Sequence, residues 1–162
     1  MDGWGVSGLD LDDPAVEWSI AQNTTMVDAG NASLRYYLNN INDKGKIWIE
    51  RPFNVTKDQT YRVTIEYAFA TSDFGGANLW RIIAGALPSR VDSVDHLEPT
   101  YQDRTGNGFD YDSGYVWLEK KYDVSAKSGS DGLLWVVIGV WGTWEGPRTY
   151  FVDDVHITLT KS

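Results

Sequence analysis

The sequence contains no cysteine, which excludes a disulfide framework, a thiolate zinc site and a cysteine nucleophile. Its only two histidines, His96 and His156, lie far apart in the chain. No apolar run approaches the ~20 residues of a membrane span, and residues 1–4 lack the basic and apolar regions of a signal peptide. A Gly-x-Ser-x-Gly elbow, a phosphate loop and a His-Glu-x-x-His helix are also missing. We therefore expect neither an enzyme nor membrane insertion.

Positive charge is scarce as well, with 14 Lys and Arg against 23 Asp and Glu and a net charge of −9. This balance argues against nucleic acid and anionic membrane surfaces as partners, and it leaves neutral ligands and cations open. The length of 162 residues suits one domain, 1–162, with a core that needs no disulfide or metal. We expect this domain to be, or to be related to, a module of a larger protein.

Aromatic residues, in contrast, are abundant: the chain has eight Trp, nine Tyr and five Phe. A core of this size rarely needs eight tryptophans. We therefore expect some of them to lie on a surface that uses them.

Alternation of apolar and polar residues dominates the chain, which is typical of strands with one buried face. In the clearest case, 61–70, the odd-numbered residues are apolar, whereas Arg62, Thr64 and Glu66 are polar. Pro52 interrupts the alternation of 46–55, which suits an edge strand or a bulge. Eight strands without an amphipathic helix predict an all-β, antiparallel sandwich or barrel. The strands are expected at 33–38, 46–55, 61–70, 79–86, 115–122, 133–141 and 149–159, and within 16–26.

The segment 133–141 is almost entirely apolar. Its even-numbered residues are aliphatic and form one face, while the other face carries Trp135, Gly139 and Trp141. Such a strand is either covered on both sides or uses its second face as a ligand platform.

The longest irregular segment is 87–114, and loops of this length usually have a function. It contains the acidic stretch 103–112, whose oxygen-bearing side chains are closely spaced. That stretch lacks the register and the terminal Glu of a helix-flanked calcium loop, so we expect an ordinary turn there.

Three landmarks occur in an order that suggests a family. They are the Asp-rich segment Gly8–Asp13 followed by Trp18, the segment Asp28–Leu34, and the ending Tyr150–Ile157 with its Asp-Asp-Val sequence. The chain thereby resembles jelly-roll carbohydrate-binding modules of the family 4, 9 and 22 type, within the galactose-binding-like superfold. This resemblance spans almost the whole chain. It implies a non-catalytic domain that binds a poly- or oligosaccharide, sits outside a bacterial or archaeal cell or on its surface, and can be attached to a catalytic domain.

The resemblance also implies a structural calcium ion between the start of the chain and the last strand. Calcium binds six to eight oxygen atoms from carboxylates and carbonyls. The matching positions are Asp10, Asp12, Asp28, Asp153 and Asp154. The other interpretation is that these aspartates occupy surface turns and strand ends, which are common in an acidic protein.

The abundant aromatic side chains suggest how sugar would be bound. A flat indole covers the apolar C–H face of a sugar ring, while nearby polar side chains bind its hydroxyl groups. Trp135 and Trp141 share a strand face, and Arg62 and Glu66 lie on the polar face of the clearest strand. The remaining candidates are two tryptophans at alternating positions, one opposite Ile47 and Ile49, and one in a glycine-rich turn: Trp80, Trp117, Trp48 and Trp144.

Two further functions stay open from the sequence. The superfold also includes protein-interaction and structural modules of cell-surface proteins, in which the tryptophans would fill the core. A small polysaccharide lyase or hydrolase is the third interpretation, since paired carboxylates such as Glu66 and Glu119 can hydrolyse glycosides.

Overall fold

The computed structural model describes residues 3–12, 14–72, 80–97, 101–104 and 115–162, and these consist mainly of strands. The short helix α1 (Val94–Leu97) lies between β6 and β7. No helix within these ranges is long and apolar enough to span a membrane. The strands are β1 (Gly5–Leu9), β2 (Glu17–Asn23), β3 (Ser33–Asn40), β4 (Lys46–Asn54), β5 (Thr60–Thr71), β6 (Trp80–Leu87), β7 (Tyr101–Arg104), β8 (Val116–Lys127), β9 (Leu133–Gly142) and β10 (Gly146–Lys161).

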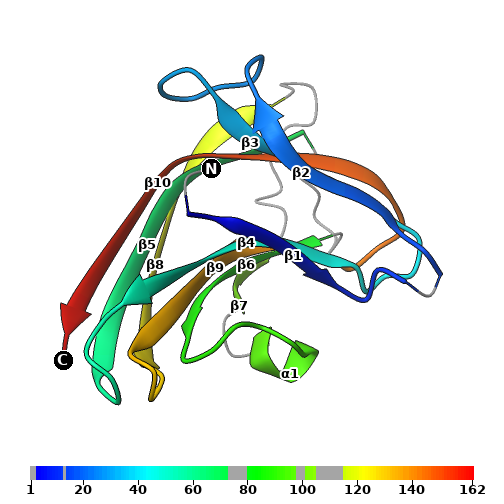
Figure 1. Ribbon diagram of the computed structural model, residues 1–162. Helices are drawn as coiled ribbons and strands as arrows, with labels where there is room; N and C mark the ends of the chain where they lie inside the picture. The colour runs from blue at the N-terminus through cyan, green and yellow to red at the C-terminus, as the bar shows by residue number, and fades with distance from the viewer. Residues whose placement is uncertain (1–2, 13, 73–79, 98–100, 105–114) are drawn as a thin grey trace.

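The strands form two five-stranded antiparallel sheets that face each other (Figure 1). Sheet A has the order β1-β4-β9-β6-β7, and sheet B has the order β2-β3-β10-β5-β8. From β3 to β6 and again from β8 to β10, consecutive strands lie in opposite sheets, so these connections tie the two layers together. The predicted all-β, antiparallel β-sandwich is confirmed.

The inward faces of the two sheets form one core. Val63 and Ile65 of β5 meet Val136 and Ile138 of β9 in this layer, and all four side chains are fully buried. Tyr36 of β3 crosses the core, and its hydroxyl group donates a hydrogen bond of 3.1 Å to the carbonyl oxygen of Ile138. Burial raises the pKa of the Tyr36 phenol, so this group stays a neutral donor that joins the sheets.

The outer face of sheet A carries a second apolar cluster, which contains Trp48, Ile83 and Val137. Val91 and Leu97 of the segment 88–97 pack on it, and this segment with α1 lies below sheet A in Figure 1. The predicted apolar strand, β9, is therefore covered on both sides in its middle.

All eight predicted strands are present, with ends that differ by a few residues. Pro52 lies within β4, where the pairing with β1 has ended at Glu50, so it occupies an edge as its missing N–H requires. Strands β1 and β7 and helix α1 were not predicted. The acidic stretch 103–112 lies outside the described residues from 105 onward.

Candidate functional site

One end of β9 carries a row of residues across the outer face of sheet A. Trp141 pairs in register with Lys46 of β4 and with Arg81 of β6. The Lys46 Nζ lies 4.5 Å from the centroid of the indole, and the Arg81 Cζ lies 5.0 Å from it. Cations at these distances are attracted to the ring face. We call Lys46, Trp141 and Arg81 the Trp141 row; its indole and its guanidinium group are partly exposed.

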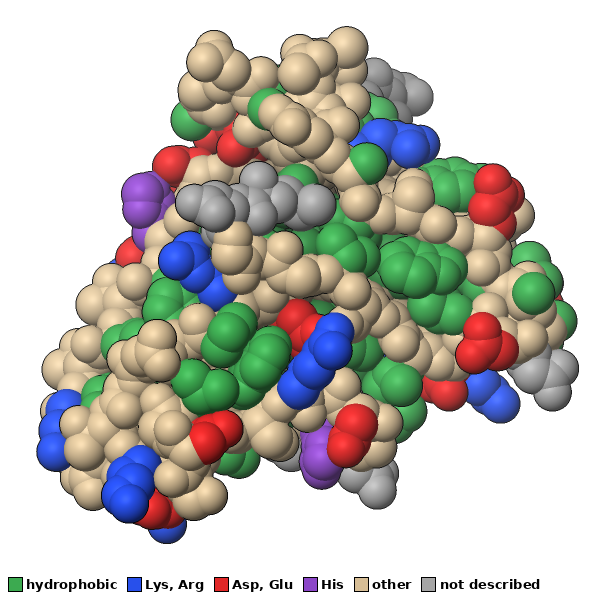
Figure 2. Space-filling view, viewed as in Figure 1, with side chains coloured by type: hydrophobic (Ala, Val, Ile, Leu, Met, Phe, Trp, Pro, Cys, Tyr) green, Lys and Arg blue, Asp and Glu red, His purple; other side chains and the backbone are tan. Residues whose placement is uncertain are grey.

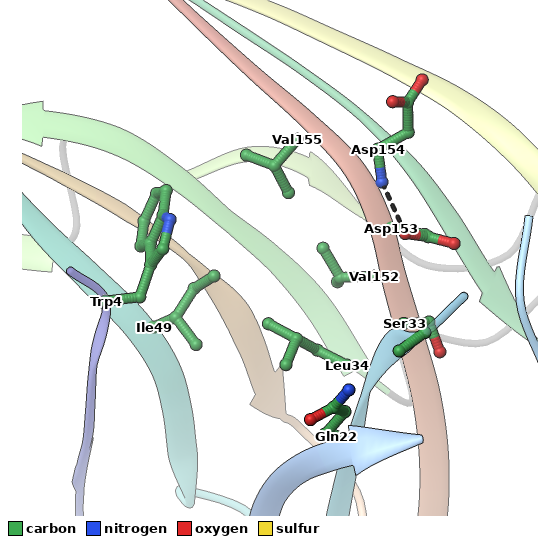
Figure 3. Close-up of a pocket in the computed structure, with 10 residues that line it drawn as sticks. Trp4, Gln22, Ser33, Leu34, Ile49, Val152, Asp153, Asp154 and Val155 are labelled. Carbon is green, nitrogen blue, oxygen red and sulfur yellow. Dashed lines mark hydrogen bonds between the residues drawn. The ribbon is translucent and has the colours of Figure 1, made fainter. Parts of the chain in front are cut away.

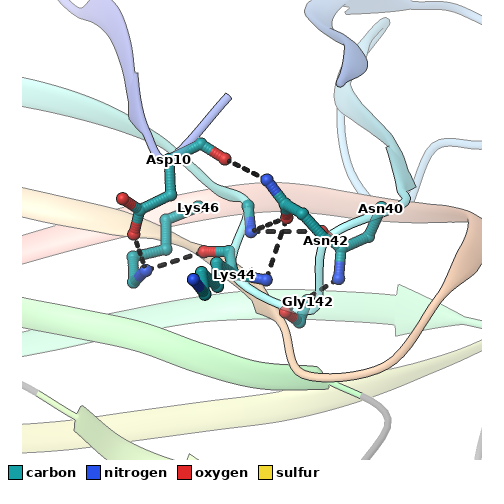
Figure 4. A network of polar contacts seen from close by, with 7 residues as sticks. Asp10, Asn40, Asn42, Lys44, Lys46 and Gly142 are labelled. Atoms are coloured by element: carbon teal, nitrogen blue, oxygen red, sulfur yellow. Dashed lines mark hydrogen bonds and ion pairs between the residues drawn. The ribbon is translucent and has the colours of Figure 1, made fainter. Parts of the chain in front are cut away.

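A polar network holds Lys46 in place (Figure 4). The Lys46 side chain is 2% exposed, and its Nζ donates to Asp10 Oδ2 at 2.5 Å and to the carbonyl oxygen of Lys44 at 2.7 Å. Asn42 donates to the carbonyl oxygen of Asp10, and Asn40 donates to the main chain at the end of β9. The network therefore fixes the strand ends that carry the Trp141 row.

The middle of the same face is closed by a buried carboxylate and its donors. Glu50 is 1% exposed and accepts hydrogen bonds from Ser7 Oγ at 2.6 Å, Trp48 Nε1 at 3.2 Å and Arg90 Nε at 2.5 Å. Trp48 is itself 1% exposed beneath the segment 88–97. Trp48 lies on the strand face opposite Ile47 and Ile49, as predicted. It is buried there, however, and is not part of a surface platform.

Trp135 lies at the opposite end of this face, where it pairs with Pro52 and Leu87 and is partly exposed. The register confirms that Trp135 and Trp141 share a strand face. Six residues of extended chain separate them by roughly 20 Å, with the covered middle between them. The two indoles could therefore contact one ligand only if it were a chain of several sugar units.

Two other predicted tryptophans lie elsewhere. Trp80 is 2% exposed inside the core, where its ring centroid is 5.3 Å from those of both Phe69 and Tyr150. It fills the space between the sheets and is not part of a surface platform. Trp144 lies in the turn between β9 and β10 and is 61% exposed, so its side chain is accessible at the surface.

The remaining predicted ligand-binding residues, Arg62, Glu66 and Trp117, lie on the outer face of sheet B. Arg62 pairs with Asp123 at 2.9 Å, and Glu66 pairs with Lys121 at 2.7 Å. Arg62 and Glu66 therefore lie on a different sheet from Trp135 and Trp141 and do not form one surface with them. Trp117 contributes instead to an aromatic patch with Tyr115 and Phe151, in which Tyr115 is 38% exposed.

The ion pair on sheet B predicts a pH effect. Hydrogen bonds from Arg62 and Thr64 lower the pKa of Asp123 from 3.8 to about 2. Because the folded-state pKa is depressed, the ionised carboxylate stabilises the fold above about pH 4, and this contribution is lost as the pH falls through about 2. An NMR titration of the Asp123 carboxyl group checks the value. The variant Arg62→Gln should shift the midpoint back toward 3.8, and a wild-type midpoint already near 3.8 would contradict the pairing.

An edge cavity of about 210 Å³ opens between the two sheets (Figure 3). Trp4 stands on one side of it, and Asp153 and Asp154 of β10 lie on the other. Gln22 and Ser33 add polar groups, while Leu34, Ile49, Val152 and Val155 supply an apolar lining. In the space-filling view of Figure 2, hydrophobic side chains lie at the surface across the middle of the molecule. The sequence indicated only the Asp-Asp pair here, and Trp4 was missed because no strand was expected near the start.

The five predicted calcium ligands separate into two places. Asp10 binds Lys46, and the nearby Asp12 is exposed. At the other place, Asp153 Oδ2 accepts the N–H groups of Asp28 and Ala29 at 2.9 and 3.1 Å. Asp154 instead pairs with His156 and has a positive φ of 49° at a bulge in β10.

The structure does not bring these five aspartates to one place. No group of three or more His, Asp or Glu side chains able to hold a metal occurs in the described part of the chain. Asp153 already uses both carboxylate oxygens on backbone N–H groups. Calcium binding stays a prediction, and among these positions Asp28 and Asp154 lie beside Asp153, each through a backbone N–H that Asp153 accepts.

The two carboxylates that line the edge cavity are both engaged: Asp153 accepts backbone N–H groups, and Asp154 pairs with His156. Glu66 is paired with Lys121, and Glu119 lies opposite Ala68 in the register of sheet B. The two histidines lie at separate exposed positions, where each pairs with an aspartate.

Comparison with known proteins finds its matches among solved structures. No protein-family model and no curated protein matches the chain. A structure of carbohydrate-binding modules with promiscuous specificity, from the β-sandwich superfamily, matches over 98% of this chain at 14% identity and a TM-score of 0.50. The chain spans 58% of that structure's length. The protein has the fold of these carbohydrate-binding modules.

Two further solved structures, an adhesin domain and a glycosidase, also match almost the whole chain. The K3 cleaved adhesin domain of Lys-gingipain from Porphyromonas gingivalis matches 98% of this chain at 14% identity and a TM-score of 0.54, over 93% of its own length. An arabinose-bound α-L-arabinofuranosidase matches 98% of this chain at 10% identity and a TM-score of 0.56, over 23% of its length. At such identities the similarity establishes the fold, which is shared by sugar-binding and adhesin domains.

Proposed function

We propose that this protein is a non-catalytic carbohydrate-binding domain and that it holds a poly- or oligosaccharide at the Trp141 row. One observation carries the proposal: a partly exposed indole lies in register between two cationic side chains. The exposed part of the indole offers an apolar surface to the C–H bonds of a sugar, and the partly exposed Arg81 beside it suits hydroxyl groups, whereas the Lys46 ammonium is buried and already bonded. The fold shared with carbohydrate-binding modules supports this assignment.

The rest of the face suggests how a longer glycan would be bound. Trp144 provides an exposed indole in the turn after β9, and Trp135 provides another indole roughly 20 Å from Trp141. Such a surface suits a chain of sugars that stays attached rather than one that is cleaved. The domain would act outside the cell, where it holds an attached enzyme or a cell surface against the glycan.

The proposal predicts that Trp141→Ala abolishes glycan binding. Loss of a central tryptophan costs about 2 kcal/mol or more, which corresponds to a loss of affinity of about 30-fold. We expect a smaller loss for Trp135→Ala and none for Tyr37→Ala, which removes an aromatic side chain from sheet B. Affinity gels loaded with a panel of plant and bacterial polysaccharides measure the binding, and circular dichroism confirms that each variant is folded.

The same variants locate the site. Unchanged binding in Trp141→Ala would remove the Trp141 row from the proposal. If Trp4→Ala then abolished binding, the edge cavity would take its place. Release of new reducing ends or unsaturated products from any polysaccharide would contradict the non-catalytic assignment.

A second function, binding to another protein, is favoured by the outer face of sheet B. Tyr115 is 38% exposed there and, like Trp117, contacts Phe151, and exposed apolar patches often bind proteins. The adhesin domains with the same sandwich fit this alternative. Failure of the wild-type protein to bind any glycan in the panel would favour it.

A further inference from the structure

The charged groups at the outer face of sheet A are not all balanced. Lys46 is paired with Asp10, and Arg90 is paired with Glu50, each at 2.5 Å. Arg81 has no carboxylate partner among the described residues. The register places Arg104 of β7, another basic residue, opposite it. Within the described residues, one cation of the Trp141 row therefore has no carboxylate partner, although the protein as a whole carries a charge of −9.

The surroundings of Arg81 restrict which groups can balance its positive charge. Its Nε is buried and lacks a hydrogen-bond partner in the part of the chain that the structure describes. The guanidinium group stays over the indole of Trp141, which offsets part of the desolvation cost but accepts no conventional hydrogen bond. Because Nε is buried, a ligand reaches the other two guanidinium nitrogens, which are not among the buried unpaired atoms and can donate to an acceptor at the surface. The side chain is partly exposed, which leaves an approach for such a ligand.

The chemistry of the row indicates the kind of acceptor. The planar guanidinium group matches a carboxylate through two parallel N–H···O bonds, and such charge-assisted bonds are stronger than bonds to hydroxyl groups. The adjacent indole requires that the anionic group be attached to something with an apolar face, as a sugar ring is. A carboxylated sugar offers a carboxylate to Arg81 and an apolar face to Trp141.

The overall negative charge of the protein limits the charge density of an anionic ligand. A densely charged polyanion is repelled by a protein of charge −9, whereas isolated negative charges on a neutral chain are repelled far less. Building on the proposed function, we propose that the glycan is an acidic one with a largely neutral backbone, and that Arg81 binds the anionic group of a single sugar that contacts the exposed part of Trp141. Sulfate esters share this chemistry with uronic acids, and the experiment separates the two.

Isothermal titration calorimetry with a matched pair of polymers tests the proposal. The pair is glucuronoxylan and the same polymer after its carboxyl groups have been reduced to alcohols. We expect the wild-type protein to bind the native polymer about tenfold more tightly than the reduced one, with the difference shrinking as salt is added. Arg81→Gln should erase the difference, and Arg81→Lys should keep part of it because it retains the charge without the fork. Lys127→Gln removes the same charge from an exposed position on β8 and should have no effect.

The outcomes separate this inference from the proposed function. Equal affinity for native and reduced polymers, both lost in Trp141→Ala, would overturn the role of Arg81 and leave sugar binding intact. Absence of binding to either polymer, to neutral polysaccharides and to a sulfated galactan would overturn both. Binding to the sulfated galactan alone, lost in Arg81→Gln, would support an anionic sugar and identify the group as a sulfate ester.

Discussion

The variant Gly139→Ala is expected to lose about 3 kcal/mol of folding free energy, the upper part of the range for overpacked sites. Gly139 lies in the middle of β9, directly opposite Trp48 of β4. An added Cβ would collide with the carbonyl oxygen of Ile47 and with Trp48 Cβ, and it would lie 2.7 Å from Trp48 Cα. Backbone atoms of a central strand cannot move aside as a flexible side chain can. The strands would have to separate at the point where Trp48 is buried.

Urea unfolding measures this loss, and Gly5→Ala is the matched control. Gly5 also lies in sheet A, but a Cβ there would meet its nearest neighbours, atoms of Glu50, at 3.8 Å, which is ordinary contact. We expect Gly5→Ala to change the stability by less than about 0.5 kcal/mol. Equal stability of the two variants would show that β4 and β9 do not approach as closely as the register requires.

Most of the fold could be predicted because the alternation of residues determines which face of a strand is buried. In 61–70 the odd-numbered residues enter the core as predicted, and the even-numbered Arg62, Thr64 and Glu66 face outward. Strand β1 escaped prediction because Gly5 and Gly8 break its pattern, and β7 because it has only four residues. The partner of each strand could not be predicted, since it depends on contacts between distant segments.

The candidate site could be predicted only in part. The alternation placed Trp135 and Trp141 on one face of β9, and the register confirms this. The burial of Trp48 depends on Val91 and Leu97, which come from an irregular segment with no strand periodicity. Trp80 alternates as a platform residue would, yet it packs against Phe69 and belongs to the core. Periodicity identifies the faces of a strand, but it does not reveal which face another segment covers.

Asp10→Ala is expected to destabilise the protein by about 2–3 kcal/mol through the loss of an ion pair. The ammonium group of Lys46 is 2% exposed, whereas the Asp10 side chain is 36% exposed. Removal of the carboxylate leaves a buried charge whose partners among the described residues are the carbonyl oxygen of Lys44 and the Trp141 ring, which is strongly unfavourable. Lys46→Met should cost less, because the Asp10 carboxylate left behind can be hydrated.

Thermal unfolding of these variants in calcium and in a chelator also decides the role of Asp10. As the partner of Lys46, Asp10 should lose the same stability under both conditions when replaced by alanine. The double variant Asp10→Ala/Lys46→Met should be more stable than Asp10→Ala alone, since it contains no unpaired buried charge. As a calcium ligand, Asp10 would matter only when calcium is present, and Lys46→Met would not rescue its loss. The second pattern would place the calcium site at the start of the chain, whereas the first would leave Asp28, Asp153 and Asp154 as the candidate ligands.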